Sequence, residues 1–488
     1  MTPRPFFLVL DQGSHAGKAM VFDGNGRIMA AAERCIGTRR PQPGWVEHDA
    51  EEVVSSLRDA VADAVASSGV AGITSAGLAI QRSSVVCWDR NTGEALSPVL
   101  SWQDRRNAGW LESQHFDPDR LREITGLVAS PHYGASKLRW CLDHLTGVQR
   151  ALVERRLCCG PLASFVLQRL LLERPCLVDP ANASRTLLWD LRSRDWSEVL
   201  LAACGVPAGC LPRCVPSRYH FGQLDAAGVR VPLTVATGDQ SAALFAHGEP
   251  SPGQLFVNIG TGAFVQRVFA GTPGNAPGLL RSLAWQDPSS TVGVLEGTVN
   301  GAGAAMQWLA EERGTAVETL VAGADRWLAE ITAPPLFLNG VGGLGAPYWV
   351  ADCPIEFSSP GSLEEATAAV LESVVFLLAV NIEALQAAST GATLGRAEAI
   401  VVSGGMARFD GLCQRLADLS GLVVRRSAAI EATAQGLAWL LGRVPAPTDG
   451  REVFFQPRAN QPLAQRYARW RGWLESRLAE LVGPATRG

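Results

Sequence analysis

Three short glycine-containing turns place backbone N–H groups where they could bind a phosphate. Asp11-Gln-Gly-Ser14, Gly260-Thr-Gly262 and Ser403-Gly-Gly405 each end an apolar run. Successive N–H groups in such a turn form a concave nest for an anion. A fourth segment, Gly238-Asp-Gln240, puts a carboxylate at the end of a further apolar run, where burial costs free energy unless the group has a partner or a task. Together these features favour chemistry on a phosphate group.

Each feature also has a purely structural interpretation. A glycine turn between two strands is most often a plain hairpin, and a carboxylate such as that of Asp11 can cap its own turn. Asp239 could likewise act as the N-cap of a helix that begins at Gln240 and Ser241. The combination, rather than any one motif, favours the functional interpretation.

Two further glycine motifs lack what nucleotide-binding loops need. Gly340 to Gly345 fits a dinucleotide fingerprint, but Pro347 and Pro354 leave no room for the helix that must follow it. The segment from Gly13 to Lys18 has three residues between its glycines where a Walker A loop has four, and Ala19 follows its lysine where that loop has Ser or Thr. We therefore expect neither a Rossmann site nor a P-loop.

The composition is that of a globular protein, with 47% hydrophobic and 18% charged residues among 488. The net charge of −4 favours neither nucleic acid nor an anionic membrane as a partner. Eleven irregularly spaced cysteines predict free, buried thiols in a reducing compartment. The apolar run from Ala368 to Val380 is too short to span a bilayer, and Phe6 to Leu10 leads into Asp11 without a signal-peptide segment. We expect a soluble cytoplasmic protein.

Short apolar runs alternate with longer amphipathic ones, as in α/β proteins. Strands are expected at 6–10, 19–22, 78–80, 85–88, 231–236, 255–259, 263–269 and 400–402, and helices at 51–67, 302–312, 363–388, 412–420, 432–442 and about 461–482. The order strand, glycine turn, strand occurs twice, in Val9–Asp23 and Phe256–Phe269, which predicts two related lobes around a cleft. We place the lobes at residues 1–245 and 246–445, with a helical tail at 446–488 after a linker at Pro445–Asp449.

In this order the motifs resemble those of the FGGY family of carbohydrate kinases, and within it most closely those of the glycerol kinases. The resemblance covers roughly residues 6 to 443. The segments that carry it are Asp11 to Ser14, Val21 to Asp23, Pro41 to Asp49, Gln81-Arg82, Ser101 to Arg106, Ser136 to Trp140, Asn182 to Leu188, Gly238 to Gln240, Gly260 to Gly262, Gly301 to Ala305 and Gly343 to Trp349. It implies an α/β fold of two actin- and hexokinase-like (ribonuclease H-like) lobes, with ATP and a polyol or sugar in the cleft between them.

The resemblance also assigns roles around the transferred phosphate. Phosphoryl transfer needs positioning, charge neutralisation and a base for the acceptor hydroxyl. Asp239 is the implied base, and Asp11 and Asp239 are the implied ligands of Mg²⁺, which prefers oxygen ligands. The implied nucleotide contacts are Ser14, His15, Lys18, Thr261, Gly303, Gln307, Gly405 and Phe409. Phe409 stands where glycerol kinases have an asparagine near the adenine, so that stacking could replace a hydrogen bond to the base.

The implied acceptor pocket departs from the glycerol kinase pattern at two positions. The pattern is matched at Arg82, Trp102, Asp239, Gln240 and Phe264. Ser83 stands where a glutamate is expected, and His132 where a tyrosine is expected. Losing a charged partner for a substrate hydroxyl argues against unaltered glycerol specificity. We expect a larger polyol or a ketose, with Ser83 and His132 contacting its added atoms, although His132 could equally be a solvated loop residue.

Two alternative functions remain open at this point. One is a ketopentose kinase of the xylulokinase or ribulokinase type, against which Gln81-Arg82 and Ser101 to Asp104 argue. The other is a catalytically silent sugar sensor, against which the retained Asp11, Asp239 and Thr261 argue. In every case we expect a small-molecule substrate, no nucleic acid or membrane partner, and a chain that could form a homodimer.

Overall fold

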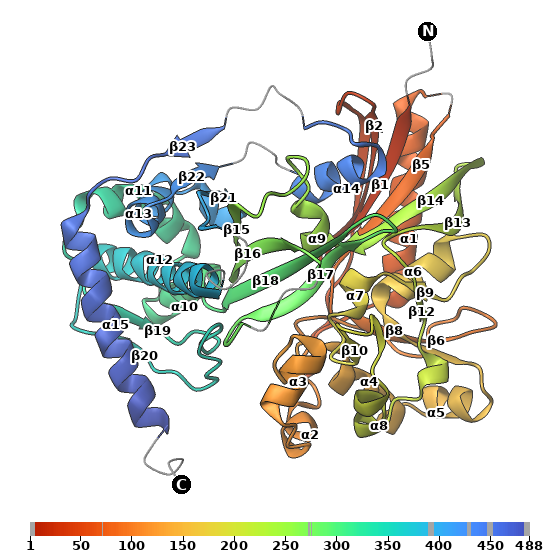
Figure 1. Cartoon of the computed structure of the whole chain (residues 1–488), viewed down its shortest axis with the longest axis horizontal. Helices are drawn as coiled ribbons and strands as arrows, with labels where there is room; N and C mark the ends of the chain where they lie inside the picture. The colour runs from red at the N-terminus through yellow and green to blue at the C-terminus, as the bar shows by residue number, and fades with distance from the viewer. Residues whose placement is uncertain are drawn as a thin grey trace.

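Two large mixed β-sheets organise the chain, one in each half of the sequence (Figure 1). The computed structural model describes residues 5–70, 72–271, 274, 276–388, 395–426, 431–446 and 452–482. The first sheet has the order β13 (Arg218–Ala226), β14 (Val229–Gly238), β5 (Ser75–Ile80), β1 (Phe6–Gln12), β2 (Ala16–Asp23) and β3 (Ile28–Cys35). The second has the order β17 (Leu280–Gln286), β18 (Thr291–Val299), β16 (Ala263–Ala270), β15 (Gln254–Ile259), β21 (Ala399–Ser403), β22 (Val423–Arg426) and β23 (Val453–Phe455).

Both sheets contain the same strand unit, as the repeated glycine turns predict. In the first lobe β1 pairs antiparallel with β2 and parallel with β5. In the second lobe β15 pairs antiparallel with β16 and parallel with β21. The α/β class and the two-lobed architecture expected from the sequence are therefore confirmed.

Alternating side chains on β1 bury the first sheet on both faces. Leu8 and Leu10 pack in one core with the apolar side of α1 (Ala50–Ser68). Phe7 and Val9 point to the opposite face and pack in another core with α14 (Ala432–Gly442). Although α14 comes late in the sequence, it covers the first lobe, so the end of the predicted second lobe crosses back over the sheet of the first.

The second lobe is built around α12 (Leu363–Ala388), a helix that the sequence predicts at these bounds. By length and composition α12 could cross a membrane, and the run we took as too short is part of it. Of its most apolar window, however, 89% is buried inside the protein, as expected of a core helix. It packs with α10 (Gly303–Glu312), α11 (Val317–Glu330) and α13 (Asp410–Ser420).

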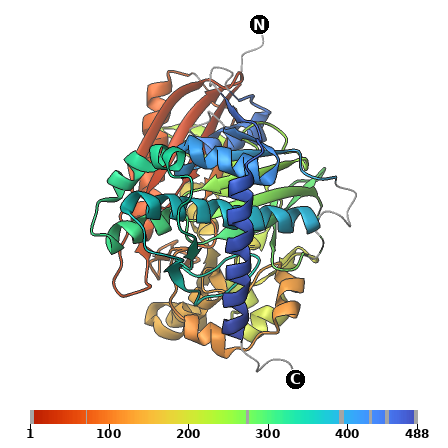
Figure 2. The ribbon, with the colours of Figure 1, turned by 90° about the vertical axis from the view of Figure 1, so that its left-hand side faces the viewer.

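The predicted C-terminal helix is present as α15 (Gln461–Val482), which lies along the outside of the second lobe (Figure 2). Trp470 attaches it to that lobe, since its Nε1 donates to the carbonyl of Phe337 over 2.9 Å. Of the expected linker Pro445–Asp449, only its first two residues are described.

A smaller subdomain extends the first lobe on the side of the acceptor residues. Its sheet has the order β4 (Glu47–His48), β7 (Val99–Leu100), β6 (Val85–Asp89) and β8 (Leu157–Pro161). Its helices are α2 (Ala108–Ser113), α3 (Pro118–Thr125), α4 (Gly134–His144), α5 (Thr146–Val153) and α8 (Glu198–Cys204). Of this subdomain only the strand at 85–88 was predicted. Trp102 follows β7, and His132 precedes α4.

The glycine motifs that were set aside behave as expected. Gly340 to Gly345 follows β19 (Phe337–Asn339) and leads into turns before β20 (Ile355–Phe357), without a helix. The segment from Gly13 runs into β2. All eleven cysteines are free thiols, eight of them buried, while Cys35 is exposed.

Candidate active site

A narrow crevice of about 60 Å³ separates elements of the two lobes. From the first lobe it is lined by Gln240 on α9 (Asp239–Ala243) and the residues that follow, and from the second by Phe264 and Gln266 on β16. Gln240 and Phe264, both predicted to bind the acceptor, therefore face one crevice from opposite sides.

Asp239 occupies the first residue of α9 rather than the N-cap, which is Gly238. Its carboxylate accepts a hydrogen bond of 2.7 Å from the backbone N–H of Gln240. Burial raises its pKa above the ordinary value, and the nearby Arg82 guanidinium opposes that rise. A raised pKa in a half-buried carboxylate suits a group that must take up a proton.

Asp11, at the end of β1, lies close enough to Asp239 for the two charges to repel. Burial, and then the charge of Asp239, raise the pKa of Asp11 to about 7. The charge of Lys18 opposes the rise in the pKa of Asp11, as that of Arg82 does for Asp239. The described residues contain no cluster of three or more His, Cys, Asp or Glu side chains that could hold a metal ion.

Arg82 follows β5 and reaches across the backbone of α9. Its Nη2 donates to Oε1 of Gln240 and lies 3.6 Å from Oε2 of Glu296. A Cβ atom at position 238 would stand 2.4 Å from Cδ of Arg82, so glycine is required there for steric reasons. Three residues of the predicted acceptor set, Arg82, Asp239 and Gln240, are thus brought together.

Trp102 links the acceptor side to the glycine turn of the first lobe. Its Nε1 donates to Oγ of Ser14 over 2.9 Å, and Ser14 donates to Oε1 of Gln81 over 3.1 Å. The ring of His132 lies edge-on to Trp102, with centroids 5.6 Å apart, and to Tyr133 at 5.1 Å. Burial, with Lys137 and nearby arginines, holds the pKa of His132 well below its usual range. The half-buried His132 is therefore a residue packed against Trp102 and Tyr133 rather than a solvated loop residue.

Ser83 is held by a lysine that the sequence analysis did not single out. Nζ of the fully buried Lys137 donates to the carbonyls of Ser83, over 3.0 Å, and His132, over 2.7 Å. Burial lowers the pKa of Lys137 to about 7. The backbone of Ser83 has a φ of 65°, and its buried Oγ has no hydrogen-bond partner among the described residues.

The second-lobe segments predicted to contact the nucleotide converge on one loop. The backbone N–H of Gly303, the first residue of α10, donates to the carbonyl of Gly260 over 2.9 Å. A Cβ at Gly303 would lie 2.8 Å from that oxygen, and one at Gly404 would lie 2.6 Å from the carbonyl of Ile259. Gly405 faces open space, and Thr261 is exposed at the tip of the hairpin. These backbones approach each other as a phosphate cradle requires.

The remaining predicted nucleotide residues differ in how they are placed. His15 is exposed, and the exposed Gln307 donates to Glu311 within α10. Lys18 forms an ion pair of 2.9 Å with Glu431, at the start of α14.

Phe409 corrects an expectation. Its side chain is 4% exposed and belongs to the core of the second lobe, so its ring has no open face on which a base could stack.

Sequence reasoning missed four charged residues that complete the site: Lys137, Arg185, Glu296 and Glu431. Lys137 and Arg185 lie within segments that carry the family resemblance. Glu296 stands alone in an apolar strand, and the desolvation argument applied to Asp239 would have identified it.

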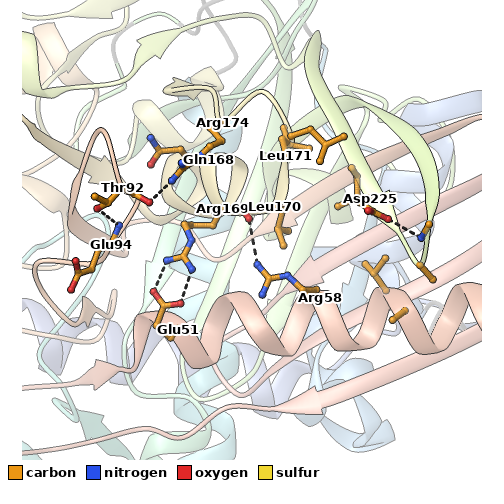
Figure 3. Close-up of a pocket in the computed structure, with 16 residues that line it drawn as sticks. Glu51, Arg58, Thr92, Glu94, Gln168, Arg169, Leu170, Leu171, Arg174 and Asp225 are labelled. Carbon is orange, nitrogen blue, oxygen red and sulfur yellow. Dashed lines mark hydrogen bonds and ion pairs between the residues drawn. The ribbon is translucent and has the colours of Figure 1, made fainter.

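A cavity of about 910 Å³ lies elsewhere, and none of the predicted residues lines it (Figure 3). It is bordered by α1, by α6 (Leu162–Leu170) and by the β13–β14 hairpin. Arg169 pairs with Glu51 of α1, and Arg58, Arg174 and Asp225 form hydrogen bonds with the backbone.

Comparison with known proteins matches the whole architecture. The model of the N-terminal domain of the FGGY family of carbohydrate kinases matches residues 6–246, and that of the C-terminal domain matches residues 255–443. The chain is 35% identical to a glycerol kinase from Geobacter sp. (strain M21), over 96% of this chain and 97% of that one. Similar structures include Plasmodium falciparum glycerol kinase with ADP (TM-score 0.86, 20% identity, 98% and 99% covered) and a xyloylose kinase from Brucella ovis (TM-score 0.84, 23% identity, 96% and 99% covered). The chain therefore belongs to the FGGY family of carbohydrate kinases, phosphotransferases with an alcohol group as acceptor.

Proposed function

We propose that this kinase transfers the terminal phosphoryl group of ATP to a hydroxyl of a polyol or sugar larger than glycerol, with Asp239 as the base. The observation that carries the proposal is that Gln240 meets Phe264 and Gln266 of the second lobe at the crevice. Asp239 precedes Gln240 in the chain, and Arg82 donates to Gln240 and lies 3.6 Å from Glu296. The exposed Thr261 hairpin and the start of α10 supply the second-lobe side.

Asp239 must be ionised to accept the proton of the acceptor hydroxyl. Its raised pKa increases its affinity for that proton, while the charge of Arg82 favours the ionised carboxylate. Arg82 would donate hydrogen bonds to neighbouring hydroxyls, and the amide of Gln240 would donate or accept them, which fixes the oxygen that approaches the phosphorus.

Asp11 and Asp239 would hold Mg²⁺ together with the phosphate oxygens. When bound, the ion neutralises charge that develops on the transferred phosphoryl group. The N–H groups of the two glycine turns would bind the phosphates from either lobe. Closure of the crevice on the acceptor would exclude water and so limit hydrolysis of ATP.

Ser83 and His132 support an acceptor larger than glycerol. Both are anchored by Lys137, and the buried hydroxyl of Ser83 has no partner among the described residues. A serine where relatives have a glutamate leaves room and a neutral donor–acceptor, which suits an additional hydroxyl or carbonyl group. Mostly buried free thiols favour a reducing compartment such as the cytoplasm.

Release of ADP, measured over a panel of polyols and ketoses with Mg²⁺, tests the proposal. We expect the highest kcat/KM for a four- or five-carbon acceptor, and a loss in kcat of about 10²- to 10⁴-fold in Asp239→Asn with ATP still bound. A high kcat/KM for glycerol with poor values for every larger acceptor would refute the proposed specificity. Near-normal turnover in Asp239→Asn would show that another group takes the proton.

A further inference from the structure

A carboxylate of the second lobe is buried against two arginines of the first. Glu296 on β18 is fully buried. Its Oε1 accepts from Nη2 of Arg185 over 3.1 Å, and its Oε2 lies 3.6 Å from Nη2 of Arg82. Gln266, on the neighbouring strand β16, donates to Oε2 over 2.8 Å. Arg82 and Arg185, by contrast, follow β5 and α7 (Pro180–Ala183) of the first lobe. The ion triad therefore crosses between the lobes.

The balance of charge keeps Glu296 ionised. Burial alone would raise its pKa, but Arg185 and Arg82 hold that pKa below its ordinary value. The guanidinium of Arg185 is further confined by the ring of Tyr133, 5.4 Å from its centre. Removing the carboxylate would leave two buried cations facing each other without a counter-charge, a costly arrangement.

Arg82 is the member of the triad that reaches the acceptor. The Nη2 atom that faces Glu296 also donates to Gln240, next to Asp239. Glu296 and Gln240 thus both contact Nη2 of Arg82, one from each lobe. The orientation of the Arg82 guanidinium therefore depends on both Glu296 and Gln240.

We propose that Glu296 is a positioning residue that fixes Arg82 in the acceptor pocket, so that the acceptor site of the first lobe is complete only while the second lobe is docked on it. The proposal rests on the proposed function. Binding of the acceptor then favours the docked arrangement of the lobes, because the free energy of binding depends on a contact made from the other lobe.

A second buried glutamate provides a matched control. Glu372 on α12 is 2% exposed and accepts from Arg466, with 2.9 Å between Nε and Oε2, and from Arg415 over 3.2 Å. This triad joins α12, α13 and α15 within the second lobe. Glu372→Gln should therefore disturb a buried charge as Glu296→Gln does, without reaching the acceptor.

The experiment measures KM for the acceptor, KM for ATP, kcat and thermal stability in both glutamine variants. For Glu296→Gln we expect KM for the acceptor to rise about 10- to 100-fold, since misplacement of a binding group by about 1 Å has effects of that order. KM for ATP should change by less than about threefold, and Glu296→Asp should recover part of the loss. Glu372→Gln should lower stability and leave KM for the acceptor unchanged.

A double-mutant cycle with Arg82→Gln separates positioning from general damage. If Glu296 acts through Arg82, the double variant should have nearly the same acceptor KM as Arg82→Gln alone. Additive effects of Glu296→Gln and Arg82→Gln on the acceptor KM would overturn the inference. So would equal rises in acceptor KM for Glu296→Gln and Glu372→Gln, provided that the wild type is active. A wild type that phosphorylates no acceptor faster than Asp239→Asn would instead refute the proposed function.

Discussion

The two glycine hairpins share a backbone plan and differ in charge. In the first, Gly13 donates across the turn to Ala16 over 3.0 Å, and in the second Gly260 donates to Gly262 over 2.8 Å. Two residues before these glycines stand Asp11 in the first lobe and Asn258 in the second. Asp11 has a raised pKa beside Asp239, whereas the amide of Asn258 donates to Ser403 over 3.0 Å.

The same strand–turn–strand unit therefore serves two different roles in the two lobes. The backbone N–H groups of either turn can face a phosphate, because they depend on the hairpin and not on side chains. Of the two hairpins, only the first carries a carboxylate next to its turn, that of Asp11. The proposed metal would therefore be held by the first lobe, and the second lobe would offer uncharged phosphate contacts.

The largest effect should come from removing the charge of the first hairpin. Asp11→Asn should lower kcat about 100-fold or more, since a preorganised charge near the transferred phosphoryl group is lost. Steady-state ADP release at saturating Mg²⁺ measures it. Asp49→Asn, which keeps an N-cap acceptor on α1, is the control and should retain full turnover. If Asp11→Asn were equally active, the metal would have to be held elsewhere.

The equivalent change in the second hairpin should be smaller. Thr261→Val keeps the shape of the side chain and removes one hydroxyl, so that KM for ATP should rise about 3- to 10-fold with little change in kcat. Thr319→Val, at an exposed position of α11, is the matched control. If Thr261→Val lowered kcat as much as Asp11→Asn does, the proposed difference between the two hairpins would be wrong.

The smallest effect concerns stability and its dependence on pH. The folded-state pKa of Asp11 is about 7 against an ordinary value of 3.8, so the folded protein retains a proton that the unfolded chain loses. Wild-type stability should therefore fall as the pH rises through this window. The Asp11→Asn variant has no titrating group at this position, so its stability should not fall in this way. The difference in Tm between this variant and the wild type should therefore increase between about pH 5 and pH 8.

Calorimetry across that pH range, repeated with Mg²⁺ and ADP, checks this. Mg²⁺ and ADP should reduce the difference in Tm between the variant and the wild type at high pH, because a cation beside Asp11 favours its ionised form. An Asn variant that is less stable than the wild type at pH 8 would mean that the Asp11 carboxylate is already compensated within the protein.

The local pattern of apolar residues predicted most of the strands and helices that position the site residues. β1, β15 and α14 appeared where apolar periodicity placed them, because each buries a face whose side chains lie close together in sequence. The subdomain of short helices around α4 was missed, since its elements are too brief to establish a period. Phe409 was misjudged for a related reason: its position along the chain said nothing about which way its ring would pack.

The strand–turn–strand units, the two aspartates and the family could be recognised from residue types alone, because they depend on short, ordered segments. That Glu296 meets Arg82 and Arg185, and that Lys137 bonds to Ser83 and His132, is visible only in the folded protein. Those contacts join residues distant in the chain or on separate elements. Their strength comes from burial, which exists only once the lobes have packed together.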